Sequence, residues 1–116
     1  MKDDFECCPY YHHAIEVIGR RWAGVIIQAL LAGATRFGDL EAAVPDISSR
    51  MLSQRLKELE TEAIIERTVI PDKPVRIEYR LTEKGRALGP VVESLSAWAN
   101  DWVECEEEKK KETGGE

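Results

Sequence analysis

The stretch from Arg36 to Arg80 constrains the fold of this chain more than any other feature of its sequence. It reads RFGDLEAAVPDISSRMLSQRLKELETEAIIERTVIPDKPVRIEYR. Phe37, Leu40 and Val44 recur at helical spacing, and Pro45 stops that run because the residue before a proline avoids the helical region. A turn, a longer helical pattern and two segments rich in β-branched residues follow. The rest of the chain must pack around this succession of elements.

The longer helical pattern has an apolar side and a polar side. Ser48 or Ser49 can cap its first turn. The apolar side, which we expect to face inward, is formed by Leu52, Leu56, Leu59 and Ala63. The polar side carries Ser49, Arg50, Ser53, Gln54 and Lys57, with Arg55 beside them. Such a face is most often simply solvated, but arginine pairs with guanine, glutamine with adenine and serine with phosphate. DNA contact is therefore a hypothesis that depends on the neighbouring elements.

The segment that follows supports this hypothesis. Residues 64–70 are predicted to form a strand, and a second strand alternates apolar with polar residues up to Leu81. The loop Pro71-Asp72-Lys73-Pro74 joins the two strands as a stiff hairpin. Two helices followed by a hairpin are typical of the winged helix-turn-helix fold, whose second helix enters the major groove of DNA. We therefore expect an α+β, mainly α fold with a two-stranded wing and flanking helices at both ends.

Basic residues outside the second helix are predicted to add contacts to DNA phosphates. Lys73 lies at the tip of the wing, and Arg76 lies one step into the second strand. Arg36 directly precedes the first helix of the motif. In this fold, cations of the wing bind the DNA backbone or enter the minor groove. With Ser48 at the start of the second helix, these residues complete the predicted DNA-binding set.

Helices are also predicted before the motif. Pro9 suits the first position of a helix, which makes Cys8 its N-cap, and Gly19 ends it. A second helix, from Trp22 to Gly33, is apolar nearly all round. Such a helix is usually buried at the centre of a small bundle.

The last predicted helix follows the wing. Thr82 can cap it, and Gly89-Pro90 should kink or split it. Leu95, Trp98 and Trp102 form a face of this helix that is too apolar to leave in water on so small a domain. Pairing with a second copy across a two-fold axis would bury that face.

The net charge of −6 argues at first against a nucleic-acid partner, but the charge is unevenly distributed. Residues 1–8 and 104–116 are acidic, whereas residues 48–86 hold nine Lys or Arg against seven Asp or Glu. We expect a flexible N-terminus over 1–8, one DNA-binding and dimerisation domain over 9–103, and a disordered charged tail over 104–116. No apolar run approaches the roughly 20 residues of a membrane span, and no signal-peptide hydrophobic region is present, so we expect a cytoplasmic protein without a membrane partner.

The three cysteines are Cys7, Cys8 and Cys105. A thiol at a helix N-cap lies near partial positive charge, which favours a reactive thiolate at Cys8, although the acidic residues before it oppose ionisation. An inert terminal thiol is the alternative. The glutamates around Cys105 suit a resolving thiol and not a primary sensor.

The sequence also bears on two further classes of site, a metal site and an enzyme active site. Cys7 and Cys8 with His12 and His13 could indicate a metal site, but adjacent pairs do not match the common spacings of structural zinc ligands. The sequence also contains no nucleophile elbow, no zinc-protease motif and no phosphate-cradling glycine loop. We therefore expect no metal, no cofactor and no enzymatic activity.

Several segments together resemble the HxlR family of bacterial winged-helix regulators. They are CPYYHHAIEVIGRRW, ATRFGDLEAAVPDISSRMLSQRLKELE, RTVIPDKPVRIEYRLTEKG and LSAWANDW, and they span roughly residues 7–103. The resemblance implies a homodimer that binds a near-palindromic operator in double-stranded DNA. It also implies pairing through the first and last helices, which would place Tyr11, Ile15, Leu95, Trp98 and Trp102 at the interface.

In a subset of this family, a cysteine directly before the first helix senses oxidants or electrophiles. Cys8 holds that position, and the additional Cys7 departs from the pattern and leaves open which thiol reacts. The same pairing of helices makes a disulfide between Cys8 and Cys105 of two subunits conceivable. The sequence thus predicts a homodimeric regulator, a repressor released by modification of Cys8. The alternatives are a constitutive DNA binder without thiol sensing, a winged-helix protein–protein interaction module and a metal sensor.

Overall fold

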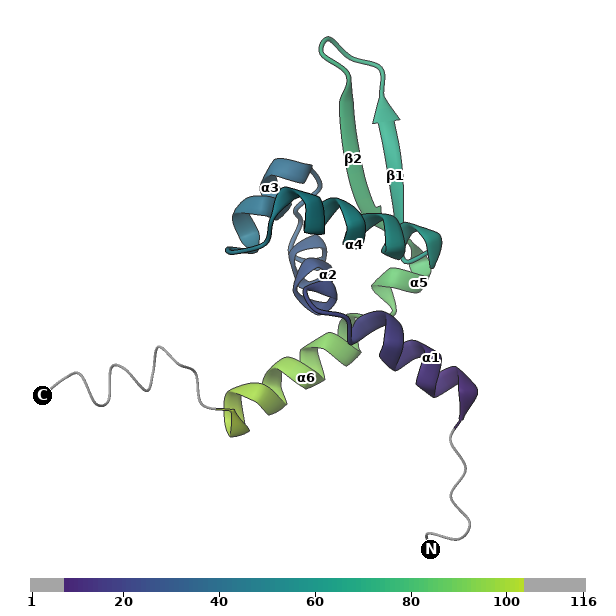
Figure 1. The fold of residues 1–116 in the computed structure, drawn as a ribbon, viewed down its shortest axis with the longest axis vertical. Coiled ribbons are helices and arrows are strands. Elements are labelled where there is room, and N and C mark those ends of the chain that lie inside the picture. The colour runs from purple at the N-terminus through teal and green to yellow at the C-terminus, as the bar shows by residue number, and fades with distance from the viewer. Residues whose placement is uncertain (1–7, 104–116) are drawn as a thin grey trace, which may run out of the picture.

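The computed structural model describes residues 8–103, and its elements follow the predicted order (Figure 1). They are α1 (Pro9–Ile18), α2 (Ala23–Leu31), α3 (Phe37–Ala43), α4 (Ser49–Thr61), β1 (Ile65–Ile70), β2 (Arg76–Leu81), α5 (Glu83–Arg86) and α6 (Gly89–Trp102). The hairpin of β1 and β2 projects from one end of the molecule, whereas α1 and α6 diverge at the opposite end (Figure 1). The predicted fold class, α+β and mainly helical with a two-stranded wing, is confirmed.

Helix α2 lies in the core, as its apolar sequence predicts. The largest fully buried side chains form one cluster with it: Ile26, Ile27, Leu40, Val44, Leu52, Leu56, Leu59 and Ile65. Only Val25 and Leu31 among the large apolar residues of α2 remain exposed, at 42% and 39%. Helix α2 contacts α3, α6 and β2, and its side chains join those of α4 and β1 in one core cluster, so its apolar surface is removed from water.

The turn between α3 and α4 has the local chemistry that the sequence indicates. Helix α3 ends at Ala43, shortly before Pro45, and Asp46 adopts the left-handed conformation with a φ of 75°. The Ser48 hydroxyl then caps α4 by accepting a hydrogen bond from the Met51 N–H at 3.0 Å. Asp tolerates a positive φ better than most residues, so the turn fits its sequence. These features end α3 and set the direction in which α4 leaves the turn.

The predicted inward position of Ala63 is wrong. Ala63 is exposed and lies beyond the end of α4, with a φ of 62°. The helix ends in a Schellman motif, because the Ile64 N–H donates to the Leu59 carbonyl and the Ala63 N–H to the Glu60 carbonyl, both at 2.9 Å. This left-handed turn swings Ala63 outward and directs Ile64, which is 3% exposed, into the core.

The wing is an antiparallel hairpin in which Ile65 pairs with Leu81 and Ile70 with Arg76. Ile65 and Leu81 at its base are buried, whereas Val69 and Val75 nearer the tip are exposed at 50% and 61%. The alternation in the sequence therefore predicts the strands but not their burial. Only the base of the hairpin reaches the core, because the rest projects beyond it (Figure 1).

The last helical region is split at Gly89-Pro90, as predicted. Thr82 caps the short α5 by accepting a hydrogen bond from the Gly85 N–H at 3.1 Å, and α6 begins anew with Pro90 in its first turn. Neither α1 nor α6 contains a fully buried residue. Within residues 8–103, no helix is long and apolar enough to cross a membrane.

Candidate nucleic-acid interface

The polar side of α4 is exposed along its length. Ser49, Arg50, Ser53, Gln54 and Lys57 all lie on it, as the sequence predicts, while the leucines of the opposite side are buried. Because the leucine side is packed on α2, the polar side is held facing outward next to the wing. A rigid helix that presents Arg, Gln and Lys to solvent has the composition of a helix that reads the major groove.

The basic side chains near this face fall into two groups. One group has carboxylate partners and consists of Arg20, Arg55, Arg76 and Arg80. The other consists of Arg36, Arg50, Lys57, Arg67 and Lys73, whose side chains make no hydrogen bond or ion pair with the residues that the structure describes. The second group includes four of the predicted DNA contacts. An unpaired cation can bind a phosphate without first losing a protein partner.

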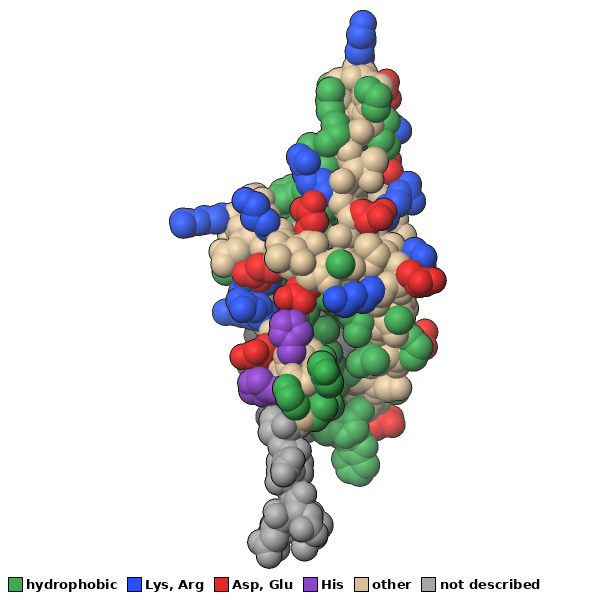
Figure 2. Space-filling model, turned by 90° about the vertical axis from the view of Figure 1, so that its right-hand side faces the viewer, with side chains coloured by type: hydrophobic (Ala, Val, Ile, Leu, Met, Phe, Trp, Pro, Cys, Tyr) green, Lys and Arg blue, Asp and Glu red, His purple; other side chains and the backbone are tan. Residues whose placement is uncertain are grey.

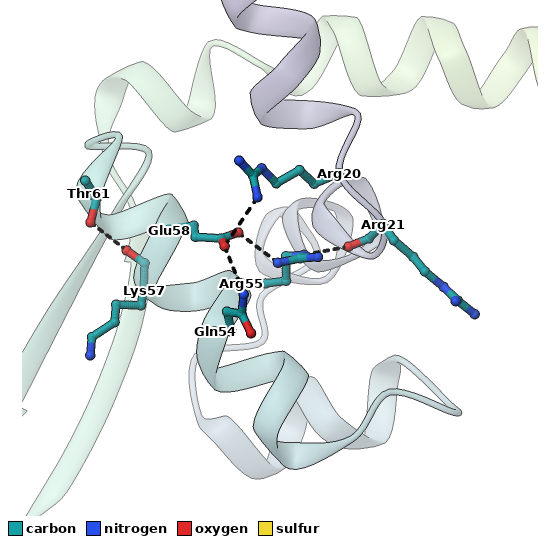
Figure 3. Close-up of polar contacts among 7 residues, drawn as sticks. All are labelled: Arg20, Arg21, Gln54, Arg55, Lys57, Glu58 and Thr61. Carbon is teal, nitrogen blue, oxygen red and sulfur yellow. Dashed lines mark hydrogen bonds and ion pairs between the residues drawn. The ribbon is translucent and has the colours of Figure 1, made fainter.

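Arg55 belongs to the structural group, although it lies on the same helix as Arg50. Its side chain is only 12% exposed and donates to Glu58 at 2.9 Å and to the Arg21 carbonyl at 2.8 Å. Figure 3 shows Arg20, Gln54 and Arg55 converging on Glu58, with Lys57 pointing away. Glu58 lies 3.5 Å from Arg20 and accepts from the Gln54 amide at 3.4 Å. This cluster ties the segment after α1 to residues 54–58 of α4.

The basic residues of the wing differ in whether they have carboxylate partners. Arg76 lies 3.9 Å from Asp72 and 3.5 Å from Glu78, and Arg80 donates to Glu78 at 2.8 Å. Arg76 and Arg80 therefore share a carboxylate on one face. Lys73 lies in the loop, and Figure 2 shows basic side chain atoms at the extreme tip of the wing. Arg76 must leave or share these partners to bind DNA, whereas Lys73 need not.

The serines at the start of α4 are also engaged. Ser48 is the N-cap, and the Ser49 hydroxyl donates to Glu41 of α3. Glu41 therefore places a negative charge beside the N-terminus of α4, where positive backbone charge would otherwise attract phosphate. Arg36 is the N-cap of α3, the helix that contains Glu41, and its side chain is exposed.

A groove of about 440 Å³ separates α4 from the wing. It is lined by Arg50, Ser53, Gln54 and Lys57 of α4 and by Arg67 and Tyr79 of the wing. We call it the wing groove. Arg67 is not among the residues that the sequence predicts to contact DNA, although strand pairing places it on the same face as its register partner Tyr79.

Cys8 is the exposed N-cap of α1, with Pro9 at the first helical position, as predicted. Arg20 and Arg21 lie beyond the other end of this ten-residue helix, which is about 15 Å long. Cys7 and Cys105, the other predicted redox residues, lie outside the described residues.

The two histidines of α1 have acidic neighbours. His12 lies 3.7 Å from Glu16, and His13 hydrogen-bonds to Glu62 at the end of α4 at 3.0 Å. The hydrogen bond with His13 holds the pKa of the Glu62 carboxyl below its ordinary value. Among residues 8–103, no three His, Cys, Asp or Glu side chains are grouped to hold a metal ion.

Large apolar side chains are exposed on α1 and α6. Tyr11 and Ile15 are exposed at 68% and 46%, and Leu95, Trp98 and Trp102 at 62%, 57% and 75%. These five residues are the predicted dimer interface, and both helices lie at the end of the molecule opposite the wing (Figure 1). So much exposed apolar surface on two neighbouring elements indicates an interaction surface.

The helix-turn-helix, the polar face of α4 and the adjoining wing define the class of this protein. It is a winged helix-turn-helix transcriptional regulator and not an enzyme. The model of the HxlR-like helix-turn-helix family matches residues 17–107, and the chain belongs to that family.

Relatives with the same organisation are similar over most of the chain. An uncharacterised regulator of Bacillus subtilis, YvaP, is 48% identical over 99 residues, which cover 85% of this chain and 92% of YvaP. The reduced form of the B. subtilis regulator YodB superposes with a TM-score of 0.76 at 44% identity, covering 85% of this chain and 97% of YodB. The oxidised form of the redox regulator HypR superposes with a TM-score of 0.78 at 35% identity, covering 84% of this chain and all of HypR.

Proposed function

We propose that this protein is a homodimeric repressor that binds a near-palindromic operator and is released when an oxidant or an electrophile modifies Cys8. The observation that carries the proposal is the exposed polar face of α4, with Arg50, Gln54 and Lys57 beside a projecting wing. In this arrangement Arg50 donates to guanine, Gln54 pairs with adenine, and Lys57 and Lys73 bind phosphates.

A second copy of the chain is the partner for α1 and α6. Their exposed apolar side chains lie far from the wing, so pairing there leaves both α4 helices free for DNA (Figure 1). A two-fold axis would present the two α4 helices to successive major grooves, about 34 Å apart or a multiple of that turn. Each half of the operator then meets one copy of Arg50 and Gln54.

Thiol regulation follows from the position of Cys8 on the helix that pairs. Modification of an exposed N-cap thiol adds bulk at the end of α1, which would change the angle between subunits and spoil the spacing of the α4 helices. The redox-related forms of YodB and HypR support this reading, since YodB has been studied after diamide treatment and with bound quinone, and HypR in reduced and oxidised forms.

Base reading is tested by replacing both Arg50 and Gln54 with Ala. We expect specific binding to an operator-containing duplex to be lost, because each bidentate contact contributes about 1–3 kcal/mol of discrimination. Gel retardation and sedimentation measure binding and dimer formation on the same samples. The matched control is Arg80→Ala, which removes an arginine that is paired with Glu78. Binding of the double variant equal to that of the wild type would show that α4 does not read the operator.

Thiol sensing is tested by titrating diamide and a benzoquinone against the wild type and Cys8→Ser on DNA. The wild type should leave the duplex, while Cys8→Ser should stay bound at the same reagent concentrations, because the serine hydroxyl does not react with either reagent. Equal release of both proteins would assign sensing to another residue. Retention of both would leave a constitutive DNA binder, the second candidate function.

A further inference from the structure

The wing groove holds a cation that the reading face of α4 does not include. Arg67 lies on β1 opposite Tyr79 of β2, and both line the groove together with Lys57. Side chains alternate between the two faces of a strand, so Arg67 shares a face with Tyr79. Arg80, the next residue after Tyr79, points to the other face and pairs with Glu78. The wing therefore presents one arginine toward α4 and holds another away from it.

The cations of this groove outnumber its acids. Arg50, Lys57 and Arg67 line it, and Glu60 is the one acidic residue of the lining within the part of the chain that the structure describes. The three cationic side chains make no hydrogen bond or ion pair with residues 8–103. Uncompensated positive charge in a concave site concentrates anions there. The wing groove therefore favours a negatively charged ligand.

The geometry of a winged helix on B-DNA identifies the anion. When α4 occupies the major groove and the wing reaches the adjacent minor groove, one sugar–phosphate strand runs between them. We propose that the wing groove binds this strand, with the Arg67 guanidinium and the Lys57 ammonium on its phosphates and the Tyr79 hydroxyl donating a further hydrogen bond. This inference rests on the proposed DNA-binding function and adds residues that the reading face does not contain.

The bound group is a backbone phosphate and not a base edge. Phosphates are the same at every base pair, so Arg67 contributes affinity and orientation of the wing but no choice of sequence. Replacing it should weaken binding equally on all duplexes, whereas replacing Arg50 or Gln54 should affect the operator most. Salt dependence provides a second signature, because each phosphate contact releases condensed counterions.

The test compares the wild type with Arg67→Ala, Arg67→Lys, Tyr79→Phe and Arg80→Ala in a salt series. The probes are a duplex of about 30 base pairs enriched from a random library by the wild-type protein, and an unrelated duplex of the same length. Fluorescence anisotropy gives the affinity. Arg67→Ala should lower it about fivefold per protomer near 0.15 M salt on both duplexes and reduce the slope of log K against log salt by about 0.9 per protomer.

The other variants test the charge of Arg67, the hydroxyl of Tyr79 and the face of the wing on which an arginine lies. Arg67→Lys should keep the wild-type slope, and Tyr79→Phe should weaken both duplexes without changing the slope because its hydroxyl is neutral. Arg80→Ala should stay within about twofold of the wild type, because its side chain is paired on the other face of the wing. The proposal is overturned if Arg67→Ala keeps the wild-type slope, if Arg80→Ala loses as much as Arg67→Ala, or if the loss is confined to the enriched duplex.

Failure of the underlying function gives a different result. A wild-type protein that enriches no sequence from the library overturns the proposed regulator function, and the unrelated duplex still reports whether Arg67 binds phosphate. Circular dichroism and sedimentation of each variant establish that Arg67 and Tyr79 act at the DNA and not through folding or dimer formation.

Discussion

At the scale of single residues, the junction between α4 and the wing depends on a close approach at Gly85. A Cβ atom at this position would lie 2.1 Å from the Ile64 carbonyl oxygen, which is backbone and cannot turn aside. The Thr82 hydroxyl joins the same turn by donating to the Ala63 carbonyl at 2.6 Å and by accepting from the Gly85 N–H. The start of β1 and the start of α5 are thus in direct backbone contact.

Gly85→Ala should therefore destabilise the protein by at least about 2 kcal/mol, because the added methyl group forces the two segments apart. Chemical denaturation at a fixed protein concentration measures the loss. Gly38→Ala is the matched control, since a Cβ at Gly38 has no atom within 4 Å and alanine favours the helix that contains it. Equal stability of the two variants would mean that the turn is not as tight as described.

At the scale of elements, α4 carries two arginines, Arg50 and Arg55, whose environments differ. Arg55 is largely buried and bonds to Glu58 and to the Arg21 carbonyl, so it fixes α4 against the segment between α1 and α2 (Figure 3). Arg50 is exposed and makes no such bond with the described residues. Arg55 therefore has a structural role, whereas Arg50 is available for the proposed contact with DNA.

Replacing each arginine with Met should distinguish an effect on folding from an effect on DNA binding. Arg55→Met should cost about 1–2 kcal/mol of folding free energy, because it leaves the Arg21 carbonyl without its donor and Glu58 without its nearest cation. Arg50→Met should change the folding free energy by less than about 0.5 kcal/mol and weaken specific DNA binding instead. Denaturation midpoints and operator affinities of the two variants decide this, and a reversed order would exchange the two assignments.

At the scale of the whole molecule, the two ends of the domain have different surfaces. The wing and α4 carry unpaired cations, whereas α1 and α6 expose aromatic and aliphatic side chains (Figure 2). Charged and apolar surfaces bind different partners, so the proposed DNA site and the proposed dimer interface do not compete. The wing lies at one end of the molecule and α1 and α6 lie at the other, so the two surfaces are apart (Figure 1).

Trp98→Glu should convert the protein to a monomer, with a dissociation constant of the dimer raised at least about 30-fold, because a charge would be buried where an aromatic anchor was. Val75→Glu is the control, as Val75 is equally exposed, at 61% against 57% for Trp98, but lies at the wing. Sedimentation velocity over a concentration series distinguishes the two. A dimer that persists in Trp98→Glu would place the interface elsewhere.

The sequence predicted the fold because its signals are local. Ser48 and Thr82 each mark a helix start by a capping hydrogen bond, and Pro9 and Pro90 do so by the fixed φ of proline. Apolar spacing marks the buried side of a helix. The position of Ala63 was wrong for the same reason. Helical spacing predicts that it faces inward, but the Schellman bonds from Ala63 and Ile64 had already ended the helix.

The sequence by itself thus determined the helix-turn-helix, the wing, the polar face of α4 and the N-cap position of Cys8, since each depends on residues a few positions apart. Only the tertiary structure decided which charges are available. Arg55 donates to the distant Arg21 carbonyl, Arg20 pairs with Glu58 of α4, and Arg67 faces α4 across the wing groove. These contacts join groups that lie far apart in the sequence, so whether an arginine stabilises the fold or is available to DNA depends on packing that no local pattern encodes.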